Sequence, residues 1–315
     1  MALDPQHHIV YSTYRRHFSD VKQTVKQVLE EGNEFFKDDL VTIHVTGSGG
    51  LSVYEFLGIP FIQEVIAGTE AINRFIPRTD VAIELGGEDS KITYLSGNLE
   101  QRMNSICAGG TGAFIDQMAN LLQTDAAGLN EMAKSHTKIY PIASRCGVFA
   151  KTDIQALINQ GASKNDIAAS VFQSVVNQTI SNLACGRPIR GNVAFLGGPL
   201  HFLPSLKERF IETLGLQGEA VISPDNSQLF VAMGAALSSR KNEPMSYASL
   251  MERARRPNEK RIENSQLVEP LFRSADEIKA FKARHAAKNL PLADLTSYEG
   301  PMYLGIDAGS TTLKL

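Results

Sequence analysis

At 315 residues, of which 43% are hydrophobic and 21% are charged, the chain is long enough to bury one large core or two modest ones. Its 31 basic and 34 acidic residues give a net charge of −3, so its overall charge does not indicate binding to nucleic acid or to an anionic membrane. No apolar run approaches about 18 residues, the opening residues do not resemble a signal peptide, and three cysteines fit a reducing cytoplasm better than a disulfide framework.

The first part of the chain alternates short strands with helical segments. The predicted strands are residues 9–14, 41–46 and 80–85, and a predicted helix is capped by Ser19 and ended by Gly32. The second strand runs into the glycine-rich residues 47–50, and the third runs into Gly86 and Gly87. Strands that end in glycines and alternate with helices predict an α/β fold.

From Gly110 onward the pattern becomes mainly helical. The predicted helices are residues 113–122, 148–159, 205–214 and 228–238 and a long helix opened by Ser163, and a short strand covers residues 192–196. Ser163 followed by Asp166 predicts a capping box. The helix at 228–238 has a small-residue face around Gly234, which predicts close packing against a neighbouring element. Beyond Arg240, residues 242–300 are predicted to be a linker with one charged helix near residues 275–288.

A phosphate-binding turn is predicted close to the C-terminal end of the sequence. There a short apolar lead runs into Asp307, Gly309, Ser310 and Thr311. Glycine lets backbone N–H groups approach a phosphate, hydroxyls add donors, and the aspartate is left to hold a hydrated Mg²⁺. The sequence lacks the spacing of a Walker loop.

Two further glycine turns follow predicted strands. Gly86 and Gly87 lead into Glu88, Asp89, Ser90 and Lys91, and Gly197 and Gly198 follow the strand at 192–196. We expect Asp89 and Asp307 to face each other across a cleft, with Lys91 and Lys314 as phosphate partners. The pair Gly197–Gly198 is expected to let the backbone approach an adenine or a ribose. A plain tight turn is the alternative for Gly86–Gly87.

Two cysteines each precede a predicted helix. Cys107 comes before Gly109, Gly110 and Thr111, and Cys146 comes before residues 147–150. Amide dipoles at a helix N-terminus stabilise a thiolate, so both are candidate metal ligands; two buried structural cysteines are the alternative. Two thiolates per chain cannot complete a four-cysteine iron–sulfur site, but a two-fold dimer would supply four. Cys185 is expected to be a packed thiol at a helix end.

Together these four loops resemble the BadF/BadG/BcrA/BcrD ATPase family, the activators of 2-hydroxyacyl-CoA dehydratases. The quoted motifs are residues 307–312, 85–91, 107–112 and 146–150, and the resemblance runs from Ile9 to Ser239 and resumes at Tyr303. It implies an actin/Hsp70/hexokinase-like ATPase fold with two ribonuclease-H-like subdomains around an ATP cleft. It also implies a homodimer that shares one [4Fe-4S] cluster and uses ATP hydrolysis to deliver a low-potential electron.

The resemblance assigns roles to individual residues. Cys107 and Cys146 become the cluster ligands, Asp89 would hold Mg²⁺, and Glu88 would sit near the attacking water, although smaller activases often carry glutamine there. The expected cofactor-binding residues are Gly86, Gly87, Ser90, Lys91, Gly109, Gly110, Thr111, Gly197, Gly198, Asp307, Gly309, Ser310 and Thr311. The implied partners are a dehydratase or a related CoA-ester reductase such as benzoyl-CoA reductase, and an electron donor such as ferredoxin or flavodoxin. Glu64 is expected either to face the cleft or this partner or to be a surface carboxylate.

The order of the motifs predicts the domain organisation. We expect a first subdomain at 1–105 that lacks its opening strands, a second, cysteine-bearing subdomain at 106–241, and a linker at 242–301. Residues 302–315 would either begin a second, tandem ATPase unit or fold back, in cis or into a neighbour, beside residues 9–14. In both cases we expect weak or absent ATP turnover. The alternative functions are a sugar or acetate-type kinase of the same fold and a non-catalytic docking module.

Overall fold

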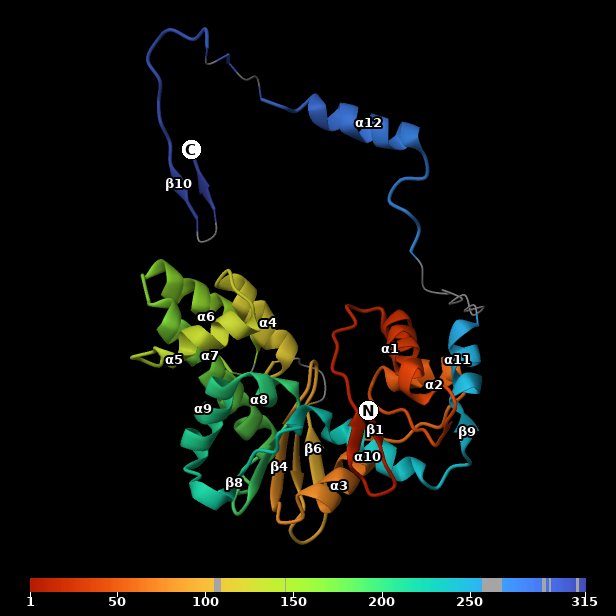
Figure 1. The fold of residues 1–315 in the computed structure, drawn as a ribbon. Helices are drawn as coiled ribbons and strands as arrows, with labels where there is room; N and C mark the ends of the chain where they lie inside the picture. The colour runs from red at the N-terminus through yellow and green to blue at the C-terminus, as the bar shows by residue number, and fades with distance from the viewer. Residues whose placement is uncertain (105–108, 145, 257–267, 291–292, 295, 310–311) are drawn as a thin grey trace. The chain divides into compact units, whose positions relative to one another are not determined.

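The computed structural model describes residues 1–104, 109–144, 146–256, 268–290, 293–294, 296–309 and 312–315 (Figure 1). The chain divides into two units, Met1–Arg256 and Pro257–Leu315. Within the described residues, no helix is both long enough and apolar enough to cross a membrane.

A five-stranded sheet forms the centre of the first unit. Its strands, in the spatial order β6-β5-β4-β7-β8, are β6 (Glu100–Met103), β5 (Ser90–Tyr94), β4 (Val81–Leu85), β7 (Val193–Leu196) and β8 (Val221–Ile222). The first three form an antiparallel meander, whereas β7 pairs in parallel with β4 and β8 in parallel with β7. Because β4 and β7 are parallel neighbours, the glycine turns that follow them lie at the same edge of the sheet.

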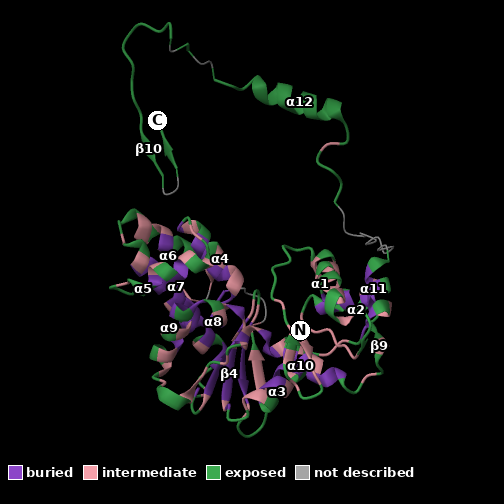
Figure 2. Cartoon of the chain, viewed as in Figure 1, coloured by how far each residue is buried: buried purple, intermediate pink, exposed green. Residues whose placement is uncertain are grey.

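Helices cover both faces of this sheet. Val81, Ile83 and Leu85 of β4 join the larger core, whereas Ala82 joins a smaller core on the opposite face, as the alternation along a strand requires. The larger core includes residues of α4 (Gly112–Leu121), α5 (Ala126–Lys134), α6 (Gly147–Asn159), α7 (Lys164–Thr179) and α9 (Pro204–Leu214). The smaller core includes residues of α3 (Glu64–Phe75) and α10 (Phe230–Ser239). Figure 2 shows the buried residues concentrated around these strands. This layered arrangement confirms the predicted α/β class.

Helices α3 and α10 pack closely at Gly234. A β-carbon built there would overlap the backbone carbonyl of Ala67 in α3, so only glycine permits the approach. The small-residue face predicted for α10 therefore makes the close contact that it was expected to make.

A third core builds a smaller lobe of the first unit. Its helices are α1 (Val21–Phe36), α2 (Gly50–Leu57) and α11 (Tyr247–Arg255). Helix α1 is capped by Asp20 rather than by Ser19, and it continues past Gly32. The glycine leaves room for the hydroxyl group of Tyr247, which donates a hydrogen bond to the carbonyl of Leu29 at 2.8 Å.

The strand predicted at residues 41–46 is mostly absent. Only β3 (Leu40–Val41) forms, paired with β9 (Met245–Ser246), and Val45 makes a single parallel bridge to Phe61. A strand needs a neighbour along its edge to form a ladder, and residues 42–46 have only this single bridge. Likewise β2 (Ile9–Tyr11) is shorter than predicted and pairs with β1 (Ala2–Leu3).

The sheet also crosses the subdomain boundary expected between residues 105 and 106. Strands β4, β5 and β6 precede that point, and β7 and β8 follow it. A division there would cut the hydrogen bonds between β4 and β7, so these five strands form one structural element.

Helix α7 is capped by Ser163, whose side chain accepts a hydrogen bond from the backbone of Asn165. Asp166 does not complete the predicted capping box. Its carboxylate instead accepts hydrogen bonds from the backbone N–H groups of Thr137 at 2.7 Å and Lys138 at 2.9 Å. Asp166 therefore ties a distant loop to the start of α7.

After α7 the chain continues as the π-helix η1 (Ile180–Ala184) and then turns at Cys185, which has a positive φ of 45°. This cysteine lies at a helix end as predicted, but it is exposed rather than packed.

The second unit contains α12 (Ala275–Ala286), which confirms the charged helix predicted in the linker, and a hairpin of β10 (Asp307–Ala308) and β11 (Leu313–Lys314). The described strand partners of Ile9–Tyr11 and of Asp307–Ala308 each lie within their own unit. The fold-back of the C-terminal segment stays a prediction.

Candidate functional site

The turn after β4 is built around Gly86. Its backbone N–H donates to the carbonyl of Asp89 at 2.8 Å, and a β-carbon at Gly86 would overlap the Asp89 carboxylate. Gly87 has open space around the position of its missing side chain. The turn is therefore tight at its first glycine and accessible at its second, which suits the approach of a ligand to the backbone.

The turn after β7 packs against β4 and against Tyr14. Gly197 has φ of 89°, and a side chain there would overlap the backbone of Leu85. Gly198 begins the short helix α8 (Gly198–Phe202), and the hydroxyl group of Tyr14 fills the place of its missing side chain. The rings of Tyr14 and Phe202 lie 5.2 Å apart. Tyr14 thus occupies space that we expected a nucleoside to approach.

Helix α4 begins directly on the Gly86–Gly87 turn. The N–H of Gly112 donates to the carbonyl of Gly86 at 3.0 Å, and the N–H of Ala113 donates to that of Gly87 at 2.7 Å. A side chain on Gly112 would lie 3.2 Å from the Gly86 carbonyl oxygen. Two of the first amides of α4 are therefore already bonded to this turn.

The predicted loop before α4 is only partly described. Thr111 is the N-cap residue of the helix, and Gly109 and Gly110 pack against Gln178 of α7, where a side chain at Gly109 would overlap the amide group of Gln178. Cys107 lies outside the described residues. Packing against Gln178 therefore favours glycine at positions 109 and 110, in addition to the predicted cofactor contact.

Lys91 lies at the start of β5 with its side chain only 4% exposed. Its ammonium lies 2.6 Å from a carboxylate oxygen of Asp89 and 3.3 Å from one of Glu84, and it also pairs with Glu64. Burial by itself would lower the pKa of Lys91, but the charge of Glu84 and the hydrogen bonds to Asp89 and Glu64 raise it overall. The pKa of Glu84 is raised, first because burial disfavours its charged form.

Cys146 is the N-cap residue of α6 and is half-buried, and it forms no disulfide. The next two large side chains, Val148 and Phe149, are 72% and 66% exposed. Gly147 packs against Phe114 of α4, so the start of α6 lies beside the helix that follows Cys107. Within the described ranges, no group of three or more metal-ligating side chains comes together.

The predicted C-terminal loop is described through Asp307, Gly309 and Lys314. Lys314 pairs with Asp307 at 2.9 Å, and the N–H of Gly309 donates to the carbonyl of Thr312 at 2.9 Å. Ser310 and Thr311 lie outside the described residues. The expected opposition of Asp307 and Asp89 stays a prediction.

Several contacts of the site were not predicted. Glu84 lies opposite Lys91 across the β4–β5 hairpin, a register that the short turn between them could have indicated. The contact from Glu64 and the ion pair of Arg16 with Asp116 of α4 at 3.0 Å join segments far apart in the sequence and had no local signal.

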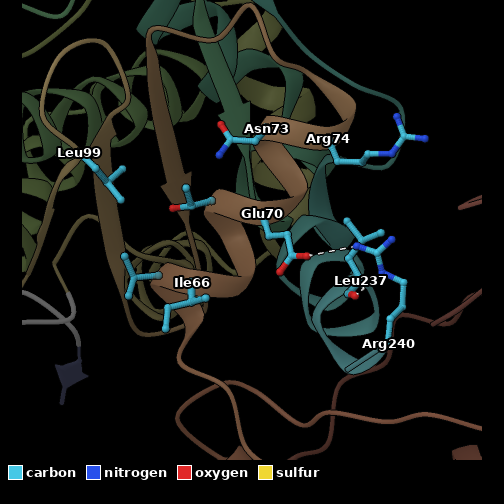
Figure 3. A pocket seen from close by; sticks show the side chains of 9 residues that line it. Ile66, Glu70, Asn73, Arg74, Leu99, Leu237 and Arg240 are labelled. Carbon is cyan, nitrogen blue, oxygen red and sulfur yellow. Dashed lines mark hydrogen bonds and ion pairs between the residues drawn. The ribbon is translucent and has the colours of Figure 1, made fainter. Parts of the chain in front are cut away.

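A cavity of about 600 Å³ lies between α3, α10 and Leu99 (Figure 3). Ile66 and Leu99 form part of its apolar lining, and Glu70 and Arg240 form an ion pair at 3.6 Å across it. This cavity shares no residue with the glycine turns described above.

The sequence profile of the BadF/BadG/BcrA/BcrD ATPase family matches residues 10–239, which is more than half of the chain. The chain belongs to this family. The match spans the glycine turns after β4 and β7 together with Cys107 and Cys146. The predicted resemblance is therefore confirmed.

Curated relatives in the family are named as dehydratase activators. The chain is 30% identical over 204 residues to the 2-hydroxyisocaproyl-CoA dehydratase activator of Clostridioides difficile, covering 64% of this chain and 74% of that protein. It is 31% identical over 178 residues to the (R)-2-hydroxyglutaryl-CoA dehydratase activating ATPase of Acidaminococcus fermentans, covering 56% of this chain and 67% of that protein.

Solved structures show the same fold. Component A of the Acidaminococcus fermentans (R)-2-hydroxyglutaryl-CoA dehydratase matches with a TM-score of 0.59 and 27% identity, covering 72% of this chain and 83% of that chain. The activator of the 2-hydroxyisocaproyl-CoA dehydratase from Clostridium difficile, solved with bound ADPNP, matches with a TM-score of 0.58 and 27% identity, covering 78% and 85%. The actin-like ATPase fold predicted from the sequence is confirmed.

Proposed function

We propose that this chain is an ATP-dependent activator that passes a low-potential electron to a 2-hydroxyacyl-CoA dehydratase or a related CoA-ester reductase. Family membership and the named activities of the relatives support the activator role. The ADPNP-bound relative supports nucleotide binding at the turns that follow β4 and β7. The electron donor would be a ferredoxin or a flavodoxin, and the site of action the cytoplasm.

One observation carries the proposal. The amides of Gly112 and Ala113 bond directly to the carbonyls of Gly86 and Gly87, so the expected nucleotide turn and the helix that follows Cys107 form one hydrogen-bonded unit. A shift of the turn when a phosphate binds must move or break these two bonds. A nucleotide event at the turn would thereby reach the start of α4 through these two hydrogen bonds.

Three residues near the turn suit the handling of Mg²⁺ and nucleotide. The carboxylate of Asp89 supplies the oxygen ligands that Mg²⁺ prefers, and the backbone of Gly87 is open to a phosphate. Glu88 is the next carboxylate along the turn and would orient or activate the attacking water. When bound, Mg²⁺ would neutralise phosphate charge during hydrolysis.

Two cysteines per chain would hold the iron–sulfur cluster. Cys146 is half-buried at the start of α6 and forms no disulfide. The exposed side chains of Val148 and Phe149 beside it would provide an apolar surface for a second subunit. Together with Cys107, which precedes α4 in the sequence, a two-fold homodimer would present four thiolates. When bound, the cluster would supply a single electron at low potential.

Anaerobic purification followed by iron and sulfide analysis tests this proposal. We expect a brown protein with about four irons per dimer, and we expect Cys107→Ser and Cys146→Ser each to abolish the colour. Cys185→Ser is the matched control and should leave the iron content unchanged, since this exposed cysteine lies at the end of a different helix. A colourless protein after iron–sulfur reconstitution would contradict the electron-transfer role and favour a kinase or a docking module.

A further inference from the structure

The ammonium group of Lys91 is already paired within the protein, unlike that of a lysine that is free to bind a phosphate. A lysine ammonium has three hydrogens and no acceptor, and here three separate carboxylates surround it. With its side chain only 4% exposed, the ammonium has no donor left over for a nucleotide. Its charge is already balanced within the protein.

The three carboxylates come from three different elements. Glu84 lies on β4, directly opposite Lys91 in the hairpin register. Asp89 belongs to the turn itself, and Glu64 is the first residue of α3. The ammonium nitrogen of Lys91 therefore connects the central sheet, the glycine turn and the start of α3.

We propose that Lys91 is a positioning residue whose ammonium, held by Glu64 and Glu84, fixes the carboxylate of Asp89 beside the Gly86 turn. This inference rests on the proposed function, in which Asp89 receives Mg²⁺ with the nucleotide.

The geometry of Asp89 suits this role. Its side chain is 34% exposed, more than that of Glu64 at 26% or of Glu84 at 19%, so Asp89 is the partner that best reaches a ligand. One of its oxygens faces Lys91, and the other lies where a side chain on Gly86 would be. An outer-sphere partner of this kind orients a metal ligand without touching the metal.

Glu64 makes this position depend on the small lobe. It follows Phe61, which bridges to Val45, by three residues. One of its carboxylate oxygens lies 3.6 Å from the place of a side chain on Gly47. Movement of the segment around Val45 and Phe61 would thus change how tightly Glu64 holds Lys91, and through it the carboxylate of Asp89.

ADP binding with and without Mg²⁺ separates positioning from phosphate contact. Calorimetry in EDTA measures the phosphate and base contacts alone, and the same titration in excess Mg²⁺ adds the contribution of the metal. The variants are Lys91→Met and Glu64→Gln. Lys134→Met is the matched control, because Lys134 pairs with Glu131 on the surface of α5.

For Lys91→Met and Glu64→Gln we expect metal-free ADP affinity to stay within about twofold of the wild type. The gain in affinity from Mg²⁺ should fall by about 10- to 100-fold in Lys91→Met, the usual effect of removing a partner of a metal ligand. The control should change neither quantity. If Lys91→Met weakens metal-free binding as much as Mg²⁺-dependent binding, Lys91 contacts phosphate and the inference is overturned.

A second measurement needs no nucleotide. Lys91→Met leaves the carboxylates of Glu64, Glu84 and Asp89 side by side without a counter-charge, so their mutual repulsion destabilises the folded variant. Removing one of these charges in the double variant Lys91→Met/Glu84→Gln should therefore recover part of the stability that Lys91→Met loses, measured by thermal unfolding at one pH. A double variant that is no more stable than Lys91→Met would show that Lys91 acts by packing alone, and would overturn the inference.

The two measurements also separate the two proposals. If the wild-type chain binds no ADP, the proposed function is contradicted, while the stabilities of Lys91→Met and Lys91→Met/Glu84→Gln still decide whether Lys91 holds the carboxylates. If Lys91→Met does not fold, Glu64→Gln answers the ADP question, because it leaves Lys91 paired with Glu84 and Asp89. A Mg²⁺-dependent gain equal to that of the wild type in Glu64→Gln would then overturn the inference.

Discussion

The contact between α3 and α10 makes a sharp prediction about stability. In Gly234→Ala the new methyl group would overlap the backbone carbonyl of Ala67, which cannot rotate away as a side chain could. The two helices must therefore separate, and because the overlap is with backbone we expect the upper part of the cost of overpacking, about 2–3 kcal/mol. Replacing a helical glycine by alanine recovers about 1 kcal/mol. We expect a net loss of about 1–2 kcal/mol, or a fall in Tm of about 2–8 °C.

Gly68→Ala is the matched control on the facing helix. The nearest atom to its new methyl group is a methyl carbon of Val231 at 4.0 Å, an ordinary van der Waals distance. This variant should keep the helix-propensity gain and melt at or above the wild type. Thermal unfolding followed by circular dichroism compares the two variants. The steric reasoning is refuted if Gly234→Ala is as stable as the wild type, or if Gly68→Ala loses as much stability as Gly234→Ala.

Two further predictions concern charge and access. The backbone N–H groups of Thr137 and Lys138 lower the pKa of Asp166 in the folded state. The carboxylate therefore stabilises the fold at pH values above its unfolded pKa of about 3.9, and this stabilisation is lost as the pH falls through the lower pKa of the folded state. Asp166→Asn should therefore melt below the wild type near neutral pH, with the difference vanishing in acid; a constant difference would contradict the assignment. Tyr14→Ala should open the space beside Gly198 and raise ADP affinity in calorimetry by roughly fivefold, or about 1 kcal/mol; weaker binding would instead make the tyrosine ring part of the nucleotide site.

Several helices were predictable because their boundary signals are local, whereas α2, α3, α5 and α11 were not predicted. Ser163 caps α7, a proline begins α9 and Ser274 caps α12, and each signal lies within a few residues of the boundary that it sets. Two of the failures are non-local. The strand predicted at 41–46 needed a neighbouring strand, and Asp166 found its partners in a loop almost thirty residues away, at Thr137 and Lys138.

The candidate site was predictable in its turns and not in its contacts. Gly86 and Gly197 were recognised because a glycine after a strand permits a turn that other residues disfavour. The three carboxylate partners of Lys91 were not predicted. A lysine beside a glycine turn favoured a phosphate contact, and only the folded chain shows that Lys91 forms an ion pair with Glu64. Tyr14 was missed for the same reason, since its contact with Gly198 joins distant segments.

The pairing of β4 with β7 also bears on how the protein reaches its native state. Val81 pairs with Val193, and the intervening chain contains the rest of the meander, the helices α4 to α7 and the π-helix η1. Ladders between residues so far apart form slowly, because a large loop must close before the contact forms. The hairpin that carries Gly86 needs only local pairing, whereas Gly197 reaches its place beside Leu85 after the helical segment has compacted. We therefore expect refolding to pass through chains that have the first turn but lack nucleotide affinity, and ligand binding to be among the last properties that the protein regains.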